Sequence, residues 1–132
     1  EMRPSVTAQS VLLVDDSAFF RNMLAPVLKA AGYKVRVAVN AQEGLSALRA
    51  QNFNVVLTDI EMPDMNGFEF AETIRADNNL SQMPIIALSS MVSPAAIERG
   101  RQAGFHDYVA KFDRPGLIAA LKEQTADVQK AA

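Results

Sequence analysis

Four short runs of apolar residues in this chain each end in a polar side chain. The runs cover residues 11–14, 55–58, 85–88 and 108–110, and they lead into Asp15-Asp16, Asp59, Ser89 and Lys111. Their length and composition favour buried strands, and helical patterns separate them. In a parallel sheet the carboxyl ends of all strands lie at one edge, where ligands bind. We therefore expect these side chains to meet in one acidic pocket with a lysine beside it.

The segments between the strands carry helix start and stop signals. After Ser17 apolar residues recur at helical spacing and predict a helix that ends at Gly32. A third helix is expected over residues 67–76, with Phe68, Ala71 and Ile74 or a similar stripe buried. The expected N-terminal caps of the second, fourth and fifth helices are Asn40 with Glu43 three residues on, Ser93 with Pro94, and Asp113.

Residues 34–39 differ from the other strands because apolar and other residues alternate. Val35, Val37 and Val39 share one face, whereas the remaining strands are continuously apolar. This pattern predicts an edge strand. The sequence thus favours an α/β fold of five βα units, a doubly wound parallel sheet of the flavodoxin-like order 2-1-3-4-5. Its switch point lies between the first and third strands, where Asp15, Asp16 and Asp59 are found.

Length and composition limit the possible classes of protein. A chain of 132 residues fits one domain, which we place at residues 10–124, with a linker over 1–9 and a tail over 125–132. The net charge of −2 argues against a nucleic-acid partner. There is no cysteine, no apolar run long enough for a membrane span, and no signal peptide at the N-terminus. A cytoplasmic protein is therefore expected, and the start at Glu1 suggests a fragment of a longer chain.

The expected pocket has the chemistry of a divalent-cation site. Three carboxylates held close together repel, at about 4 kcal/mol for each close pair at an effective dielectric constant near 20. A divalent cation removes that repulsion, and ligands that are all oxygen favour Mg²⁺ or Mn²⁺. Asp16 and Asp59 as ligands, supported by Asp15, would suit phosphoryl transfer. Lys111 could then pair with the phosphoryl group, and the Ser89 hydroxyl could donate a hydrogen bond to it.

Each of these residues also has an ordinary structural explanation. Asp15-Asp16 could be a solvated loop or a helix cap, and Asp59 a turn residue. Ser89 could be a cap, and Lys111 a solvated lysine. The combination of four such positions on four strand ends favours the functional interpretation.

At this point the chain resembles the receiver domains of two-component response regulators. The matching segments are residues 11–17, 57–67, 84–90 and 108–111. The separations of 30 residues from Asp59 to Ser89 and 52 from Asp59 to Lys111 are similar to those of chemotaxis-type receivers. The resemblance covers about residues 10–124.

The resemblance assigns a role to each residue of the pocket. It implies that Asp59 is the phosphoacceptor and that Mg²⁺ is bound by Asp16, Asp59 and the backbone carbonyl of Glu61, with Asp15 in support. Ser89 would be the switch hydroxyl, Lys111 the lysine that senses the phosphoryl group, and Tyr108 the aromatic switch residue. The donor would be a histidine kinase or a histidine phosphotransfer domain. Such a protein is no enzyme beyond catalysing its own phosphorylation and dephosphorylation.

Two positions depart from the usual pattern of the family. Phe112 follows the lysine, where receivers usually have a cis-proline, and a cis bond before Phe would cost about 3–4 kcal/mol. A trans loop is therefore expected. The Lys111-Phe112-Asp113 variant resembles receivers attached to CheA-type hybrid kinases or CheV-type coupling proteins. Glu61 and Met91 occupy the positions at which the family tunes the lifetime of the phosphoryl group.

The first helix carries a candidate docking surface. Phe20, Leu24 and Leu28 share its core face with Val27, so Phe19 and Met23 fall on the outer face beside the pocket. A pair of exposed apolar residues is typical of a docking patch, and we expect it to contact the helix of a phosphodonor. A kink at Pro26 that turns Phe19 inward is the alternative.

Two other functions remain open. Phosphatases of the haloacid dehalogenase type also use a strand-end Asp and Mg²⁺, but they place an Asp where this chain has Glu61, and no cap insertion is present. A degenerate receiver that binds partners without being phosphorylated is the second. All five site positions are filled, which argues against it, whereas Phe112 is the departure that speaks for it. A phosphorylated receiver could act as a conformational switch or as a phosphate sink, and the dephosphorylation rate separates the two.

Overall fold

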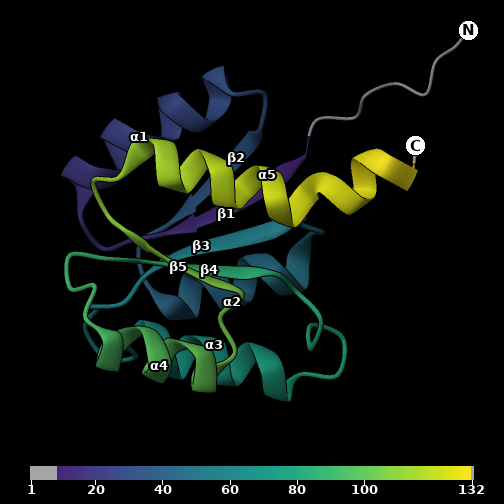
Figure 1. Ribbon diagram of the computed structural model, residues 1–132. Coiled ribbons are helices and arrows are strands. Elements are labelled where there is room, and N and C mark those ends of the chain that lie inside the picture. Colours follow the sequence, from purple (N-terminus) through teal and green to yellow (C-terminus); the bar gives the residue numbers. More distant parts are fainter. Residues whose placement is uncertain (1–8, 132) are drawn as a thin grey trace, which may run out of the picture.

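Five parallel strands alternate with five helices over residues 9–131, the part of the chain that the computed structural model describes (Figure 1). In chain order the elements are β1 (Ser10–Val14), α1 (Ala18–Ala30), β2 (Lys34–Ala38), α2 (Ala41–Ala50), β3 (Val55–Asp59), α3 (Gly67–Ala76), β4 (Ile85–Ser89), α4 (Pro94–Ala103), β5 (Asp107–Ala110) and α5 (Arg114–Ala131). The strand order is β2-β1-β3-β4-β5, which confirms the predicted fold.

The two segments expected to flank the domain differ in how far the structure describes them. The linker assigned to residues 1–9 lies outside the described residues, apart from residue 9. Within the tail assigned to residues 125–132, the described residues 125–131 are helical, because α5 continues without a break to Ala131. None of the helices in residues 9–131 combines the length and apolar character that a membrane span requires.

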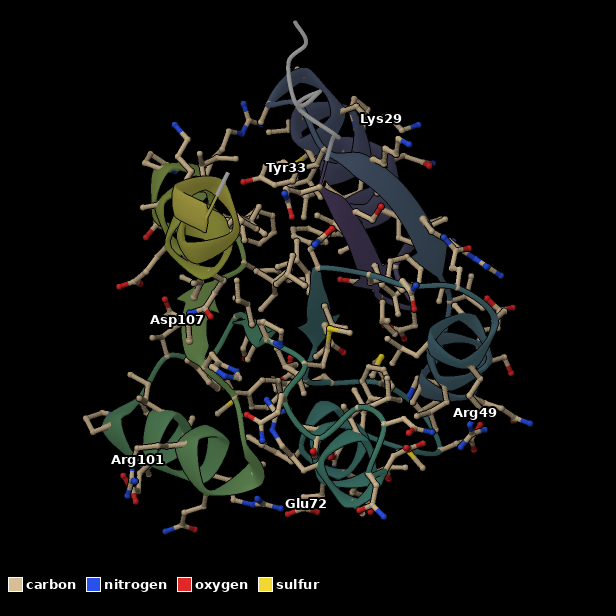
Figure 2. The ribbon with its side chains drawn as sticks, turned by 90° about the vertical axis from the view of Figure 1, so that its right-hand side faces the viewer. Lys29, Tyr33, Arg49, Glu72, Arg101 and Asp107 are labelled. Carbon is tan, nitrogen blue, oxygen red and sulfur yellow. The ribbon has the colours of Figure 1, made fainter. Side chains whose placement is uncertain are left out.

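Helices cover both faces of the sheet. Figure 1 shows α1 and α5 on one face and α2, α3 and α4 on the other. Alternate residues of β1 enter the two cores: Val11 and Leu13 pack beneath α1 and α5, and Leu12 and Val14 pack beneath α2 and α3. Because both faces are covered, β3 and β4 are buried along their whole length, as their continuous apolar sequences require. Figure 2 shows the charged side chains of Arg49, Glu72 and Arg101 on the outer surface.

The predicted helix signals are found where they were expected. The N–H of Phe20 donates to Ser17 Oγ at 3.2 Å, and the N–H of Glu43 donates to Asn40 Oδ1 at 2.8 Å. The caps Ser93 and Asp113 accept in the same way. Gly104 ends α4 with a φ of 108°, a left-handed conformation that glycine adopts without strain.

The structure refines the burial on α3 and in β2: Ala71 and Ile74 of α3 are buried as expected, and β2 is the predicted edge strand. On α3 the fully buried aromatic residue is Phe70, whereas Phe68 is only partly buried and lies beneath the Arg99 guanidinium, 4.7 Å from its ring centroid. In β2 the buried residue at the pocket end is Ala38, while Val37 and Val39 are 43% and 38% exposed. This exposure fits the predicted edge position of β2, which pairs only with β1 among the described strands.

The start of α3 lies directly against the end of β3 at Gly67. A Cβ atom at this position would lie 2.5 Å from the backbone oxygen of Asp59 and 2.8 Å from Ile60 Cα. The Gly67 N–H also donates to the Ile60 carbonyl at 2.8 Å. The missing side chain therefore lets α3 approach the strand that carries Asp59.

We predict that Gly67→Ala lowers the free energy of unfolding by about 1–3 kcal/mol, because backbone atoms must move to admit the methyl group. Urea denaturation followed by circular dichroism measures the change. The control is Glu72→Ala on the exposed side of the same helix, which breaks only a surface ion pair with Arg99 and should cost less than about 1 kcal/mol. Equal midpoints for the two variants would contradict the close approach at Gly67.

Candidate functional site

Three carboxylates meet at the carboxyl edge of the sheet. Val14 and Thr58 are paired in the register of β1 and β3, and the next residue of each strand end is Asp15 and Asp59. One carboxylate oxygen from each of Asp15, Asp16 and Asp59 lies within 4.8 Å of the other two. Asp15 and Asp59 are buried, whereas Asp16 is exposed. The cluster predicted from the sequence therefore forms, with an opening to solvent at Asp16.

Backbone groups fix one oxygen of each buried carboxylate. The N–H of Ser17 donates to Asp15 Oδ1 at 2.8 Å, and the N–H of Ile60 donates to Asp59 Oδ1 at 2.8 Å. Arg21 Nη1 donates to the backbone carbonyl of Asp15 at 2.7 Å and so braces the end of β1. These bonds leave the Oδ2 atoms of Asp15 and Asp59 available to the pocket.

Lys111 brings the positive charge of the site. Its Nζ lies 3.1 Å from Asp15 Oδ2 and 3.4 Å from Asp59 Oδ2, and its side chain is 14% exposed. Burial alone would lower the pKa of Lys111, but its contacts with Asp15 and Asp59 outweigh burial, so the pKa lies above its ordinary value. Lys111 is thus a fixed cation between the two buried carboxylates.

Without a bound metal ion, the ionised form of Asp59 is poorly stabilised. Burial raises its pKa to about 6, and the negative charge of Asp15 acts in the same direction. Lys111 lowers the pKa, and Glu61 raises it slightly. One ammonium therefore does not compensate the negative charges that converge on this edge of the sheet.

The residues present fit a hard divalent cation. The three aspartates offer only oxygen ligands, which suits Mg²⁺. Asp15 Oδ2 is buried and accepts no hydrogen bond of good geometry, although Lys111 Nζ lies within ion-pair distance. An unsatisfied buried carboxylate oxygen is costly, and a cation or its bound water would satisfy it.

The serine and tyrosine of the site are joined through one backbone position. Ser89 is buried, and its Oγ accepts a hydrogen bond from the Met91 N–H at 3.0 Å. The same hydroxyl lies 3.4 Å from Glu61 Oε2, to which it donates. The Tyr108 hydroxyl donates to the Met91 carbonyl at 3.1 Å. The connection of Ser89 to Tyr108 through Met91 was not predicted, because backbone N–H and carbonyl groups are common to almost every residue type and cannot be read from a residue pattern.

The candidate docking residues on α1 differ in exposure. Phe19 is 73% exposed, so the alternative in which Pro26 turns it inward does not hold. Met23 is partly buried and packs against the core cluster that contains Phe20 and Leu24. Its assignment to the outer face was therefore only partly correct, because the sheet and α5 enclose a wider strip of α1 than its most apolar positions define.

Two aromatic residues near Lys111 were not predicted to belong to the site. Phe20, expected only in the core, lies beneath Lys111 Nζ, with its ring centroid 4.5 Å away. Phe112 packs against Phe20 with a centroid separation of 5.9 Å and perpendicular rings. No cis peptide bond occurs within residues 9–131, so the loop at Phe112 is trans as expected. Lys111 nonetheless reaches both carboxylates.

Comparison with known proteins gives a match over most of the chain. Residues 11–122 match the family model of the response regulator receiver domain. The chain is 33% identical over 108 residues to a gliding motility regulatory protein of Myxococcus xanthus, covering 82% of this chain and 14% of that protein. It is 32% identical over 114 residues to a two-component response regulator of Oryza sativa subsp. japonica, covering 84% of this chain and 67% of that protein. The solved structure of chemotaxis response regulator CheY4 of Vibrio cholerae has a TM-score of 0.83 and 33% identity, covering 89% of this chain and 99% of that chain.

Fold and site together define a class and then a family. A doubly wound sheet with its polar site at the switch point between β1 and β3 is the flavodoxin-like α/β architecture. Within that architecture, the chain belongs to the response regulator receiver domains of two-component systems. The resemblance drawn from the strand-end motifs is thereby confirmed.

The raised pKa of Asp59 predicts how Asp59→Asn changes stability. A carboxyl group whose pKa rises from 3.8 unfolded to about 6 folded stabilises the fold below about pH 4, and this contribution is lost as the pH rises through 6. At pH 7.5 without Mg²⁺ the ionised group therefore costs up to about 3 kcal/mol. We expect Asp59→Asn to be more stable there by about 1–3 kcal/mol, since asparagine cannot ionise.

Urea denaturation at pH 7.5 and pH 5, with and without Mg²⁺, measures this difference. The advantage of Asp59→Asn should shrink at pH 5, where much of the wild-type carboxyl is protonated, and with saturating Mg²⁺, which stabilises the wild-type fold by binding it. Glu72→Gln on the exposed face of α3 is the control and should follow the wild type. A wild-type protein more stable than Asp59→Asn at pH 7.5 without Mg²⁺ would show that Lys111 outweighs burial.

Proposed function

We propose that Asp59 accepts a phosphoryl group from a phosphohistidine on a histidine kinase or a histidine phosphotransfer domain. Asp16, Asp59 and the backbone carbonyl of Glu61 would hold Mg²⁺, with Asp15 in support. The observation that carries this proposal is the buried Asp59 carboxylate, with Lys111 Nζ 3.4 Å from its Oδ2 and two further aspartates within reach. The chemistry would be confined to the phosphorylation and dephosphorylation of this domain, which is not an enzyme for other substrates.

The chain's own residues support each part of the transfer. The Ile60 N–H holds Asp59 Oδ1, so Oδ2 is the oxygen that attacks phosphorus. A bond from Oδ2 to phosphorus forms as the bond from phosphorus to the histidine nitrogen breaks, and the imidazole leaves. With a pKa of about 6, Asp59 is mostly ionised at neutral pH and holds the lone pair that the attack needs. A bound Mg²⁺ would neutralise charge on the transferring group.

Phosphorylation would act on the hydroxyl of Ser89. A phosphoryl group adds acceptor oxygens and negative charge, which attract Lys111 and the Ser89 hydroxyl. Ser89 Oγ, now 3.4 Å from Glu61 Oε2, would redirect its proton to the phosphoryl group. The Met91 N–H that bonds Ser89 Oγ would move with it, and the Met91 carbonyl holds the hydroxyl of Tyr108. The switch is thus a change at the loop between β4 and α4 that reaches Tyr108.

Phe19 is the residue of the proposed docking surface that the fold leaves free. It lies two positions after Ser17, whose N–H bonds the Asp15 carboxylate, so a helix seated on Phe19 would stand beside the pocket. The chain spans 14% of its Myxococcus xanthus relative and 67% of its Oryza sativa relative, so related receivers occur in proteins of very different length. Function as a switch or as a phosphate sink depends on the lifetime of the phosphoryl group.

Intact-protein mass after incubation with acetyl phosphate tests the central proposal. We expect a phosphoryl adduct that requires Mg²⁺ and is lost in Asp59→Asn, because the variant has no carboxylate oxygen at this position to attack phosphorus. Asp64→Asn, which changes an exposed carboxylate in the next loop, is the matched control and should keep the adduct. No adduct from acetyl phosphate or from a cognate phosphodonor would make the domain an interaction module that works without phosphorylation.

A second variant tests the docking surface. For each variant we compare two rates, phosphoryl transfer from a phosphorylated donor domain and phosphorylation by acetyl phosphate. Phe19→Ala should lower the ratio of the first rate to the second about tenfold, since loss of a large exposed aromatic contact weakens association with the donor. Rapid-quench measurement of both rates gives the ratio. Lys29→Ala, at the far end of the same helix, should leave the ratio unchanged. A ratio for Phe19→Ala equal to that of the wild type would exclude Phe19 from the docking surface.

A further inference from the structure

Lys111 has a third contact besides its two carboxylates. The ring of Phe20 lies 4.5 Å from Nζ and belongs to α1, whereas Asp15 and Asp59 belong to the strand ends. The face of an aromatic ring carries partial negative charge and attracts an ammonium, most strongly where water is excluded. Phe20 is 2% exposed and Lys111 14%, so this contact is shielded from solvent.

Phe20 is in turn held by Phe112. The two rings are perpendicular, with centroids 5.9 Å apart, which is the edge-to-face geometry that aromatic pairs favour. Phe112 keeps this contact although it is 70% exposed and immediately follows Lys111 in the chain. The backbone beside the lysine is therefore tied to the same ring that contacts the ammonium.

We propose that Phe20 and Phe112 are positioning residues that hold the Lys111 ammonium where it can bind the phosphoryl group on Asp59. This inference rests on the proposed phosphorylation of Asp59 and deepens it. The ion pairs with Asp15 and Asp59 alone would leave the Lys111 ammonium free to shift between the two carboxylates. The ring of Phe20 limits that movement from the side of α1, and Phe112 fixes both the ring and the trans loop that carries the lysine.

The first test reads the position of Lys111 without any phosphorylation. Protons above an aromatic ring resonate upfield, so the ε-methylene protons of Lys111 should be shifted relative to those of other lysines. NMR of protein with isotope-labelled lysine, assigned with Lys111→Arg, should show this shift in the wild type and its loss in Phe20→Leu. An unshifted Lys111 signal in the wild type, or the same shift in a folded Phe20→Leu, would overturn the proposal.

Substitutions of the exposed Phe112 distinguish the effect of its aromatic ring from that of its size. Phe112→Leu keeps an apolar side chain but removes the ring edge, whereas Phe112→Tyr keeps the ring. We expect Phe112→Leu to reduce the Lys111 shift and to slow phosphorylation by acetyl phosphate about threefold or more, in line with the strength of the edge-to-face aromatic contact that holds Phe20. Phe112→Tyr should restore both. Because Phe112 is exposed, these variants remain informative if Phe20→Leu fails to fold.

The small donor also excludes a docking explanation for Phe112. A residue that only contacts a partner protein has no effect on acetyl phosphate, so wild-type rates and shifts in Phe112→Leu would overturn its positioning role. The control is Val37→Ala, which changes an exposed apolar residue on β2, far along the chain from Phe112, and it should match the wild type. If the wild type itself forms no adduct, the proposed phosphorylation fails, and the NMR shift still decides whether the rings position Lys111.

Discussion

The ion pairs of Lys111 with Asp15 and Asp59 set the geometry and the charge balance of the functional site. Both carboxylates are buried at the ends of neighbouring strands, where each alone would be strongly disfavoured. Lys111 directly follows β5, an edge strand of the sheet, so its ammonium connects that strand to the ends of β1 and β3. The compensation is incomplete, which leaves Asp59 with a raised pKa and the pocket receptive to a cation.

Hydrogen bonds around Ser89 extend from the side of the pocket to Tyr108, so a modification of Asp59 could change the surroundings of Tyr108. Ser89 stands beside the pocket with its hydroxyl shared between Glu61 and the backbone of Met91. Tyr108 holds the carbonyl of that same residue. A new set of acceptor oxygens at Asp59 would compete for the Ser89 proton, and the loop after β4 connects Ser89 to Tyr108 on β5 through the backbone of Met91.

Aromatic residues line the side of the pocket formed by α1 and the loop after β5. Phe19 points to solvent, while Phe20 on the same helix turn is buried beneath Lys111. Phe112 combines both situations, since it is largely exposed yet packs on Phe20. Neighbouring positions of α1 thus differ in their proposed roles, docking for Phe19 and positioning of Lys111 for Phe20.

The sequence by itself determined the strand order, the helix caps and the convergence of Asp15, Asp16, Asp59 and Lys111. These features follow from local periodicity and from the rule that parallel strands share one carboxyl edge. Tertiary packing alone decided that Phe70 rather than Phe68 is buried and that Phe20 and Phe112 meet around the lysine. The physical reason is that contacts between side chains from different elements depend on helix rotation and depth against the sheet, which periodicity within one segment does not encode.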